Sequence, residues 1–303
     1  MSNYSNVVLS DDPNTPWYRI FAYIEPQSRV LDVGCSAGNF GKALIDQKKC
    51  MVDGIEVNKQ DSIKAKKKLM NVYNINIENT DFKNLPGDYR YIYFGDVIEH
   101  LVDPVSVLKK ITKLLSKDGE ILFSIPNMAH LSVRLMLLSG EFNYAKTGLL
   151  DNTHLHFYTF KEIERVFNEA GYEIVYQKPI IKEYPRKLLA KELKKVGLKG
   201  EETFFKRALN SDAVVWQYVG AARRSNTPKE AAVLPAISPG LEFEELYATT
   251  AQECRDIILE NKQLQEQYQT ALKVIRQKNK ELHTSKNLPY FVMKKIKNRL
   301  KST

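Results

Sequence analysis

The sequence predicts an α/β fold, in which a doubly wound, mostly parallel sheet of seven strands carries helices on both faces and a helical or coiled-coil extension follows. Apolar runs typical of buried strands alternate with helix-periodic segments over residues 1–225. A glycine-containing loop follows the first run and begins a helix. A stretch with three prolines, 226–240, then separates this part from a long polar helical pattern.

The predicted strands are short runs rich in apolar residues, and most of them end at glycine, proline or polar residues. They are Arg29–Val33, Met51–Val57, Asn74–Ile77, Tyr91–Phe94, Glu120–Ile125, Glu173–Gln177 and Ala213–Ala222. The predicted helices between them are Asn39–Gln47, Lys59–Leu69, Pro104–Leu115 and Phe160–Ala170. Strands separated by helices are expected to run parallel, and the last two strands are expected to lie side by side at one edge.

The chain of 303 residues has a formal net charge of +9, and two segments concentrate the basic residues. Segment 186–207 has eight basic residues against three glutamates, and segment 286–303 has six basic residues and no acid. Segments of this kind face either solvent or an anionic partner, and for 186–207 the sequence does not distinguish these two interpretations. Apolar residues share one helical face of 286–303, so we expect this basic amphipathic tail to contact an anionic membrane surface.

The chain divides into a main domain (1–225), a linker (226–240), a helical or coiled-coil extension (241–285) and the tail. The heptad pattern of the extension is flawed, so it predicts either a coiled coil with a second copy or a protein partner, or a single packed helix. Three cysteines without C-x-x-C spacing favour a reducing compartment. Since neither a secretory signal nor a membrane-spanning run is apparent, we expect a cytoplasmic protein, peripheral at the inner membrane face through its tail.

The most informative segment is Val30–Phe40, where an apolar strand ends in a loop of small residues that begins a helix. Gly34 and Gly38 allow the backbone to turn sharply and to approach a ligand closely. The helix that follows offers backbone N–H groups and the positive end of its dipole. Such a site can hold the carboxylate of an amino-acid-like cofactor. A dinucleotide site would place a glycine at position 36, where this chain has Ser36.

Acidic residues follow three further predicted strands. Glu56 ends the second strand, where a carboxylate can accept hydrogen bonds from two ribose hydroxyls. Asp81 and Phe82 follow the third, and Asp96 follows the fourth. Because ligands of open α/β sheets bind at the carboxyl ends of the strands, these residues predict one shared site.

The loop Asp32-Val33-Gly34-Cys35-Ser36-Ala37-Gly38 resembles motif I of the class I S-adenosylmethionine-dependent methyltransferases, usually written D-x-G-C-G-x-G. The segment Asp96–Leu101 is similar to the D-x-x-E-H-L element of that superfamily. The resemblance covers about residues 17–224 and implies a Rossmann-like fold, methyltransferase activity and S-adenosyl-L-methionine as the cofactor. It implies cofactor contacts from Asp32, Gly34, Ser36, Gly38, Phe40, Glu56, Asp81, Phe82 and Asp96, with Asp81 at the adenine amino group and Phe82 packed on its ring.

The acceptor is predicted from 126–160, a long segment that is expected to act as a substrate lid. Its run Asp151–Thr159 looks like the D-x-T-H-x-x-F-[FY]-T signature of methyltransferases encoded among bacterial surface-glycan genes. That resemblance implies an O-methyltransferase acting on a sugar hydroxyl of a surface glycan or its lipid-linked precursor. His154 is predicted as the general base and His100 as a second catalytic residue. The alternative is that His154 and His156 only pack against or cap the following helix.

Three alternatives remain open. Asp96, Glu99 and His100, with His154 or His156, could ligate a divalent metal, an arrangement similar to that of small-RNA 2′-O-methyltransferases. The preferred interpretation assigns no metal and treats nucleic acid as an improbable partner. The E-H-L element also occurs in metal-free quinone and small-molecule methyltransferases, which keeps such acceptors open. A non-catalytic scaffold for a glycan-assembly partner is the alternative of another class, although a scaffold has no need of Glu56 and Asp81.

Overall fold

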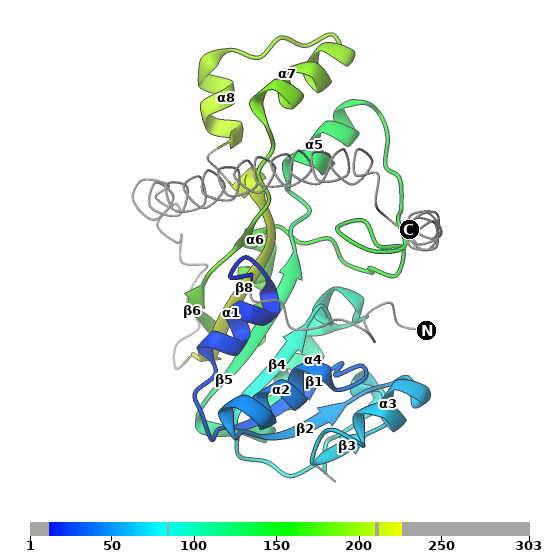
Figure 1. Ribbon diagram of the computed structural model, residues 1–303, viewed down its shortest axis with the longest axis vertical. Helices are drawn as coiled ribbons and strands as arrows, with labels where there is room; N and C mark the ends of the chain where they lie inside the picture. The colour runs from blue at the N-terminus through cyan, green and yellow to red at the C-terminus, as the bar shows by residue number, and fades with distance from the viewer. Residues whose placement is uncertain (1–11, 84, 210–211, 226–303) are drawn as a thin grey trace, which may run out of the picture. The chain divides into compact units, whose positions relative to one another are not determined.

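The computed structural model describes residues 12–83, 85–209 and 212–225 (Figure 1). The predicted linker, the extension with its coiled coil and the basic tail all lie outside these residues. Within the described part, no helix is long and apolar enough to cross a membrane.

A single sheet of eight strands forms the centre of this part. Its strands are β1 (Arg29–Val33), β2 (Met51–Ile55), β3 (Asn71–Tyr73), β4 (Tyr89–Gly95), β5 (Leu115–Pro126), β6 (Tyr172–Gln177), β7 (Ile180–Ile181) and β8 (Val215–Arg224). The order is β3-β2-β1-β4-β5-β8-β6, and β7 also pairs with β8. The strands β1 to β5 pair in parallel, whereas β8 runs antiparallel to β5, β6 and β7. The predicted α/β architecture with a mostly parallel sheet is confirmed.

Helices cover both faces of this sheet, which explains why its strands are apolar on both sides. The helices are α1 (Pro16–Tyr23), α2 (Asn39–Lys48), α3 (Lys59–Ala65), α4 (Pro104–Ile111), α5 (Leu131–Leu138), α6 (Phe160–Glu169), α7 (Arg186–Lys195) and α8 (Glu202–Leu209). Along β1, Val30 packs in one core cluster with residues of α1 and α2. Leu31 and Val33 pack in the other with residues of α4 and α6. The alternation follows from the period of two residues in a strand.

The third strand lies earlier than predicted, at Asn71–Tyr73 and not at Asn74–Ile77. Register with β2 decides this, because Val72 pairs with Gly54 and its side chain is buried in the core. Asn74 ends the strand by donating its side-chain amide to the carbonyl oxygens of Glu56 and Val57. Ile77 instead begins a 3-10 helix, η1 (Ile77–Asn79). The two-residue strand β7 was also missed, since so short a run gives no periodic signal.

The basic segment 186–207 forms the two helices α7 and α8. Leu189 and Leu193 of α7 pack with Phe205 of α8 and Leu131 of α5 in a small separate core. The lysines of α7 are exposed. The helices are therefore amphipathic, with Leu189, Leu193 and Phe205 facing this core and the charged side chains facing solvent.

Candidate active site

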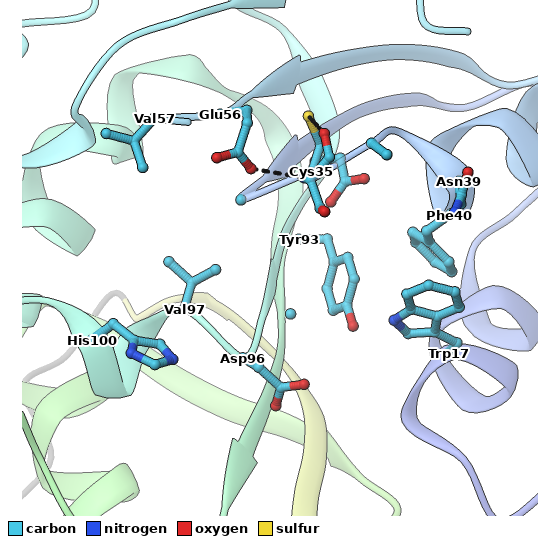
Figure 2. Close-up of a pocket in the computed structure, with 15 residues that line it drawn as sticks. Trp17, Cys35, Asn39, Phe40, Glu56, Val57, Tyr93, Asp96, Val97 and His100 are labelled. Carbon is cyan, nitrogen blue, oxygen red and sulfur yellow. Dashed lines mark hydrogen bonds between the residues drawn. The ribbon is translucent and has the colours of Figure 1, made fainter. Parts of the chain in front are cut away.

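A pocket of about 340 Å³ opens at the carboxyl ends of β1, β2 and β4 (Figure 2). Seven of the residues predicted from the sequence line it, namely Asp32, Gly34, Ser36, Phe40, Glu56, Asp96 and His100. It lies beside the boundary between β1 and β4, where the strand order reverses, which is the usual ligand site of such sheets. The glycine loop, the acidic ends of the second and fourth strands, and His100 therefore meet in one cavity.

The loop between β1 and α2 is held in the left-handed backbone region. Gly34, Ser36 and Gly38 have φ values of 73°, 49° and 74°. Glycine adopts this region without strain, whereas Ser36 adopts it at a cost. A Cβ on Gly34 would lie 2.6 Å from Cγ2 of Val97, so position 34 also excludes a larger side chain by contact. Gly38, although absent from the lining, sets the N-terminus of α2 and packs against Ala65.

Glu56 is fixed by the backbone of the same loop. One carboxyl oxygen accepts a hydrogen bond from the Ser36 N–H at 2.8 Å, and the other accepts one from the Asn58 N–H at 2.7 Å (Figure 2 draws the first). Each carboxylate oxygen has a second lone pair. Glu56 therefore keeps acceptor capacity on both oxygens at the pocket wall, which is what a pair of neighbouring hydroxyl groups requires.

Asp32 lies deeper, on β1, and is 3% exposed. Its Oδ2 is buried and accepts no hydrogen bond from the described residues. Burial, and then the negative charge of Glu56, raises the pKa of Asp32 to about 8. A buried acid without a partner is costly, and a cationic group in the pocket would lower that cost.

Aromatic side chains form another part of the wall. The Trp17 and Phe40 ring centroids are 6.0 Å apart, and those of Phe40 and Tyr93 are 5.1 Å apart (Figure 2). Trp17 and Tyr93 line the pocket but were not predicted as site residues. Tyr93 could have been found, since it lies near the carboxyl end of β4, two residues before Gly95. Trp17 comes from a helix that precedes the sheet, and no local pattern marks it.

Besides Gly38, two predicted cofactor residues, Asp81 and Phe82, are not among the described residues that line the pocket. Asp81 is exposed and forms an ion pair with Lys83 at 2.7 Å. Hydrogen bonds from Lys83 hold the pKa of Asp81 below its usual value. Phe82 is 1% exposed and packs in the core on the α4 side of the sheet. Their predicted contacts with adenine remain predictions.

Glu99, His100 and His154 form a cluster at the His100 wall. Glu99 and His100 belong to the 3-10 helix η2 (Ile98–His100) that follows β4, while His154 comes from the loop before α6. His154 Nε2 is 4.0 Å from Oε1 of Glu99, and the His100 and His154 ring centroids are 4.8 Å apart. Burial, and then the neighbouring Asp96, raises the pKa of Glu99 well above its usual range. Burial, and then His100, lowers the pKa of His154.

The D-x-T-H run positions this cluster. Asp151 accepts hydrogen bonds from the Thr153 N–H at 2.8 Å and from its hydroxyl at 2.7 Å, which shapes a tight turn. The Thr153 carbonyl oxygen lies 3.0 Å from Nδ1 of His100. The backbone carbonyl of Glu99 accepts hydrogen bonds from the N–H groups of Leu155 and His156. These bonds bring His154 against η2 across a separation of more than fifty residues.

Asp96 lies between the two halves of the site. It has a φ of 54° and lines the pocket. Its Oδ1 accepts hydrogen bonds from the Ser124 hydroxyl and the Gln217 amide. Burial raises the pKa of Asp96 to about 7, against the opposite effect of these two hydrogen bonds.

The other two histidines of the predicted lid lie outside the Glu99 cluster. His130 is 2% exposed and caps the N-terminus of α5 through the Ser132 N–H. His156 has its Nε2 3.4 Å from the Val102 carbonyl oxygen. The predicted lid segment itself forms α5 and the loop up to Thr159.

A doubly wound sheet with a glycine-cornered loop after its first strand and a carboxylate after its second defines a domain that binds a nucleoside-containing cofactor. A family model described as a methyltransferase domain matches residues 16–177, which is more than half of the chain. The chain belongs to this methyltransferase domain family. The pocket is therefore the candidate cofactor site of a methyltransferase domain.

The ubiquinone biosynthesis O-methyltransferase of Neisseria meningitidis serogroup A is 26% identical over 154 residues, which are 48% of this chain and 64% of that protein. The protein of the same name from Nitrosospira multiformis is 26% identical over 182 residues, covering 54% of this chain and 75% of that one. The chain thus spans 64% of the length of the Neisseria relative. A solved S-adenosylmethionine-dependent methyltransferase from Archaeoglobus fulgidus superposes with a TM-score of 0.48 at 18% identity, covering 70% of this chain and 92% of that one.

Proposed function

We propose that the protein transfers the methyl group of S-adenosylmethionine to a hydroxyl oxygen, and that the hydroxyl belongs to a sugar of a bacterial surface glycan or its lipid-linked precursor. The observation that carries the oxygen acceptor is a pair of imidazoles, of which His100 lines the cofactor pocket and His154 packs against His100 with ring centroids 4.8 Å apart. A hydroxyl needs a group that handles its proton, and imidazoles are the side chains most often used for this.

The residues present fit the cofactor. Glu56 keeps one lone pair on each carboxyl oxygen for the two ribose hydroxyls. The buried acid Asp32, whose Oδ2 has no hydrogen-bond partner among the described residues, suits the ammonium group of the amino-acid portion. Gly34 leaves space that a Cβ would fill. No side chain of the described residues caps the N-terminus of α2, so its N–H groups suit a carboxylate.

When bound, the cofactor supplies a methyl group already activated by a positively charged sulfur. The chain must then hold the acceptor oxygen in line and keep water out. Trp17, Phe40 and Tyr93 give the pocket an apolar wall that excludes water. The loop that carries His154, tied to η2 through the Glu99 carbonyl oxygen, forms the acceptor side.

Support for the sugar acceptor comes from the Asp151–Thr159 run. Its aspartate and threonine shape the turn that presents His154, and the threonine carbonyl orients His100. The run therefore builds the acceptor wall of the site, which is where a signature shared among enzymes with similar acceptors is expected. The names of the relatives support a second candidate, a phenolic hydroxyl of a quinone precursor.

The test is methyl transfer from radiolabelled S-adenosylmethionine by the purified full-length protein. Host extract is fractionated into glycan, lipid-linked precursor, small quinone-like molecules and RNA. Label in the glycan or lipid-linked fraction is expected. Label only in the quinone-like fraction would replace the sugar by the second candidate. S-adenosylhomocysteine binding without label in any fraction would refute the enzyme and favour the scaffold.

A further inference from the structure

The Glu99 carboxyl group is buried without a hydrogen bond. Glu99 is 1% exposed, and within the part of the chain that the structure describes neither of its oxygens accepts a hydrogen bond from another residue. Asp96, three residues earlier, is a second acid and is half-buried beside it. Burying a polar or charged group without a hydrogen bond or an opposite charge is unfavourable. The site therefore requires a cation or a proton to complete it.

Two imidazoles face this carboxyl group. One ligand atom each from Glu99, His100 and His154 lie within 4.8 Å of one another. The distance of 4.0 Å between His154 Nε2 and Glu99 Oε1 exceeds that of a hydrogen bond, so the two groups face each other without a direct bond. In a zinc site with ligand distances of about 2.0–2.2 Å, tetrahedral ligand atoms are about 3.4 Å apart. The ligand atoms would therefore have to approach one another by about 1.4 Å at most, which rotation of the side chains can provide.

A hydrogen bond also holds the His100 imidazole in a tautomer that can ligate a metal. Nδ1 of His100 lies 3.0 Å from the Thr153 carbonyl oxygen. Because a carbonyl only accepts, Nδ1 carries the proton, and the lone pair of the neutral ring is on Nε2. A backbone carbonyl that orients a histidine in this way is the usual outer partner of a metal ligand. The His154 side chain is 6% exposed and lies in the same cluster.

We propose that Glu99, His100 and His154 bind one divalent transition-metal ion, with open coordination positions toward the pocket. Two imidazoles and one carboxylate form a set typical of zinc and of non-haem iron sites with open positions. The imidazoles favour Zn²⁺ over Mg²⁺, which prefers oxygen ligands. Asp96 is excluded from the set because its carboxylate lies outside the three-residue cluster. His156 is excluded because it lies outside the three-residue cluster.

The role of the ion rests on the proposed function. His100 both lines the pocket and belongs to the cluster, so an acceptor hydroxyl at this wall could ligate the ion through its oxygen. Ligation makes a hydroxyl more acidic. The acceptor oxygen would give its proton to water and form the new bond to the methyl carbon, while the electrons of the carbon–sulfur bond stay with sulfur. His100 and His154 would then act as ligands, and not as the general base predicted for His154.

The site is tested by titrating the chelator-treated full-length protein with Zn²⁺ in a calorimeter, without cofactor or acceptor. One ion per chain is expected. Glu99→Gln, His100→Ala and His154→Ala should each weaken Zn²⁺ binding by about 100-fold or more, since removal of an outer partner alone weakens metal sites about 10- to 100-fold. His156→Ala is the matched control from the same loop and should leave Zn²⁺ affinity unchanged. No stoichiometric binding, or equal binding by all variants, would overturn the proposal.

A second measurement does not depend on whether the variants fold. X-ray absorption of the zinc-loaded wild-type protein should show nitrogen and oxygen ligands at about 2.0–2.2 Å with imidazole scattering. Zinc without imidazole scattering would overturn the site as well. If the protein binds zinc but a chelator leaves methyl transfer unchanged, the site is supported and its role in catalysis is refuted. Methyl transfer by a protein that binds no zinc would overturn the site and leave the proposed function standing.

Discussion

Replacing Glu56 by glutamine tests the cofactor half of the site most directly. The carboxylate accepts two backbone hydrogen bonds, from Ser36 and Asn58, at 2.8 and 2.7 Å. In Glu56→Gln one oxygen becomes an NH₂ group, which cannot accept, so one of these backbone N–H groups loses its partner. The acceptor for one ribose hydroxyl is lost with it. A hydrogen bond to a charged group contributes about 1.5–3 kcal/mol, which corresponds to roughly 10- to 150-fold in affinity.

The assay is calorimetric titration with S-adenosylhomocysteine, alongside thermal unfolding of the same samples. Glu78→Gln is the matched control, because Glu78 accepts backbone hydrogen bonds from Val102 and Asp103 at 2.8 and 3.1 Å but is not among the described residues that line the pocket. Only Glu56→Gln should lose affinity, and only it should lose a backbone hydrogen bond, because Glu78 accepts both of its bonds on the one oxygen that glutamine retains. Unchanged affinity in Glu56→Gln, or an equal loss in Glu78→Gln, would refute the assignment of Glu56 to the ribose.

Three further predictions concern the loop, the buried acid and the first helix. Gly34→Ala should abolish S-adenosylhomocysteine binding in calorimetry, because the new Cβ would lie 2.6 Å from Val97. Gly140→Ala is the control, since Gly140 has the same φ of 73° and no described atom within 4 Å, and it should show only the backbone cost of about 1–2 kcal/mol in urea unfolding. Equal behaviour of the two variants would contradict the contact argument. Because the pKa of Asp32 is raised from 3.8 to about 8, the folded state keeps a proton on Asp32 that the unfolded state releases. The free energy of unfolding should therefore fall as pH rises from about 4 to 8 and should level off above pH 8. Asp32→Asn should remove this part of the slope, and urea unfolding at several pH values that gave identical slopes would refute the shift. Lys48→Met should lower the free energy of unfolding by about 1.5–3 kcal/mol, because the Lys48 ammonium group caps α1 by donating to the Phe21 and Ile24 carbonyls. The affinity for S-adenosylhomocysteine should not change. An unchanged denaturation midpoint would argue against the cap.

The cofactor half of the site could be predicted from sequence because its signals are local. Gly34 and Glu56 each follow directly on an apolar strand, and parallel strands bring their carboxyl ends to one edge. Trp17 could not be found in this way, since its place beside Phe40 depends on how α1 packs. Asp81 was predicted from its position after the third strand. In the structure its side chain forms an ion pair with Lys83 in solvent, and its contact with adenine stays a prediction.

The acceptor half depends on contacts that a linear pattern does not contain. Glu99 and His100 are adjacent in sequence, but His154 reaches them only because its loop is tied to the Glu99 carbonyl oxygen. The sequence grouped His130 with the site on composition alone, whereas in the structure His130 caps α5. The third strand was misplaced for a related reason. Both Asn71–Tyr73 and Asn74–Ile77 are short and partly apolar, and only pairing with β2 distinguishes them.

The segment that follows β4 joins the two halves of the site. Asp96 and Val97 face the cofactor pocket, and Glu99 and His100 begin the acceptor wall, all within five consecutive residues. The left-handed backbone at Asp96 turns the chain at the point where the strand order reverses. In the proposed function, one turn therefore connects the cofactor side of the site to the acceptor side. Such a connection bears on a displacement reaction, because a misplacement of one ångström costs about 100-fold in rate.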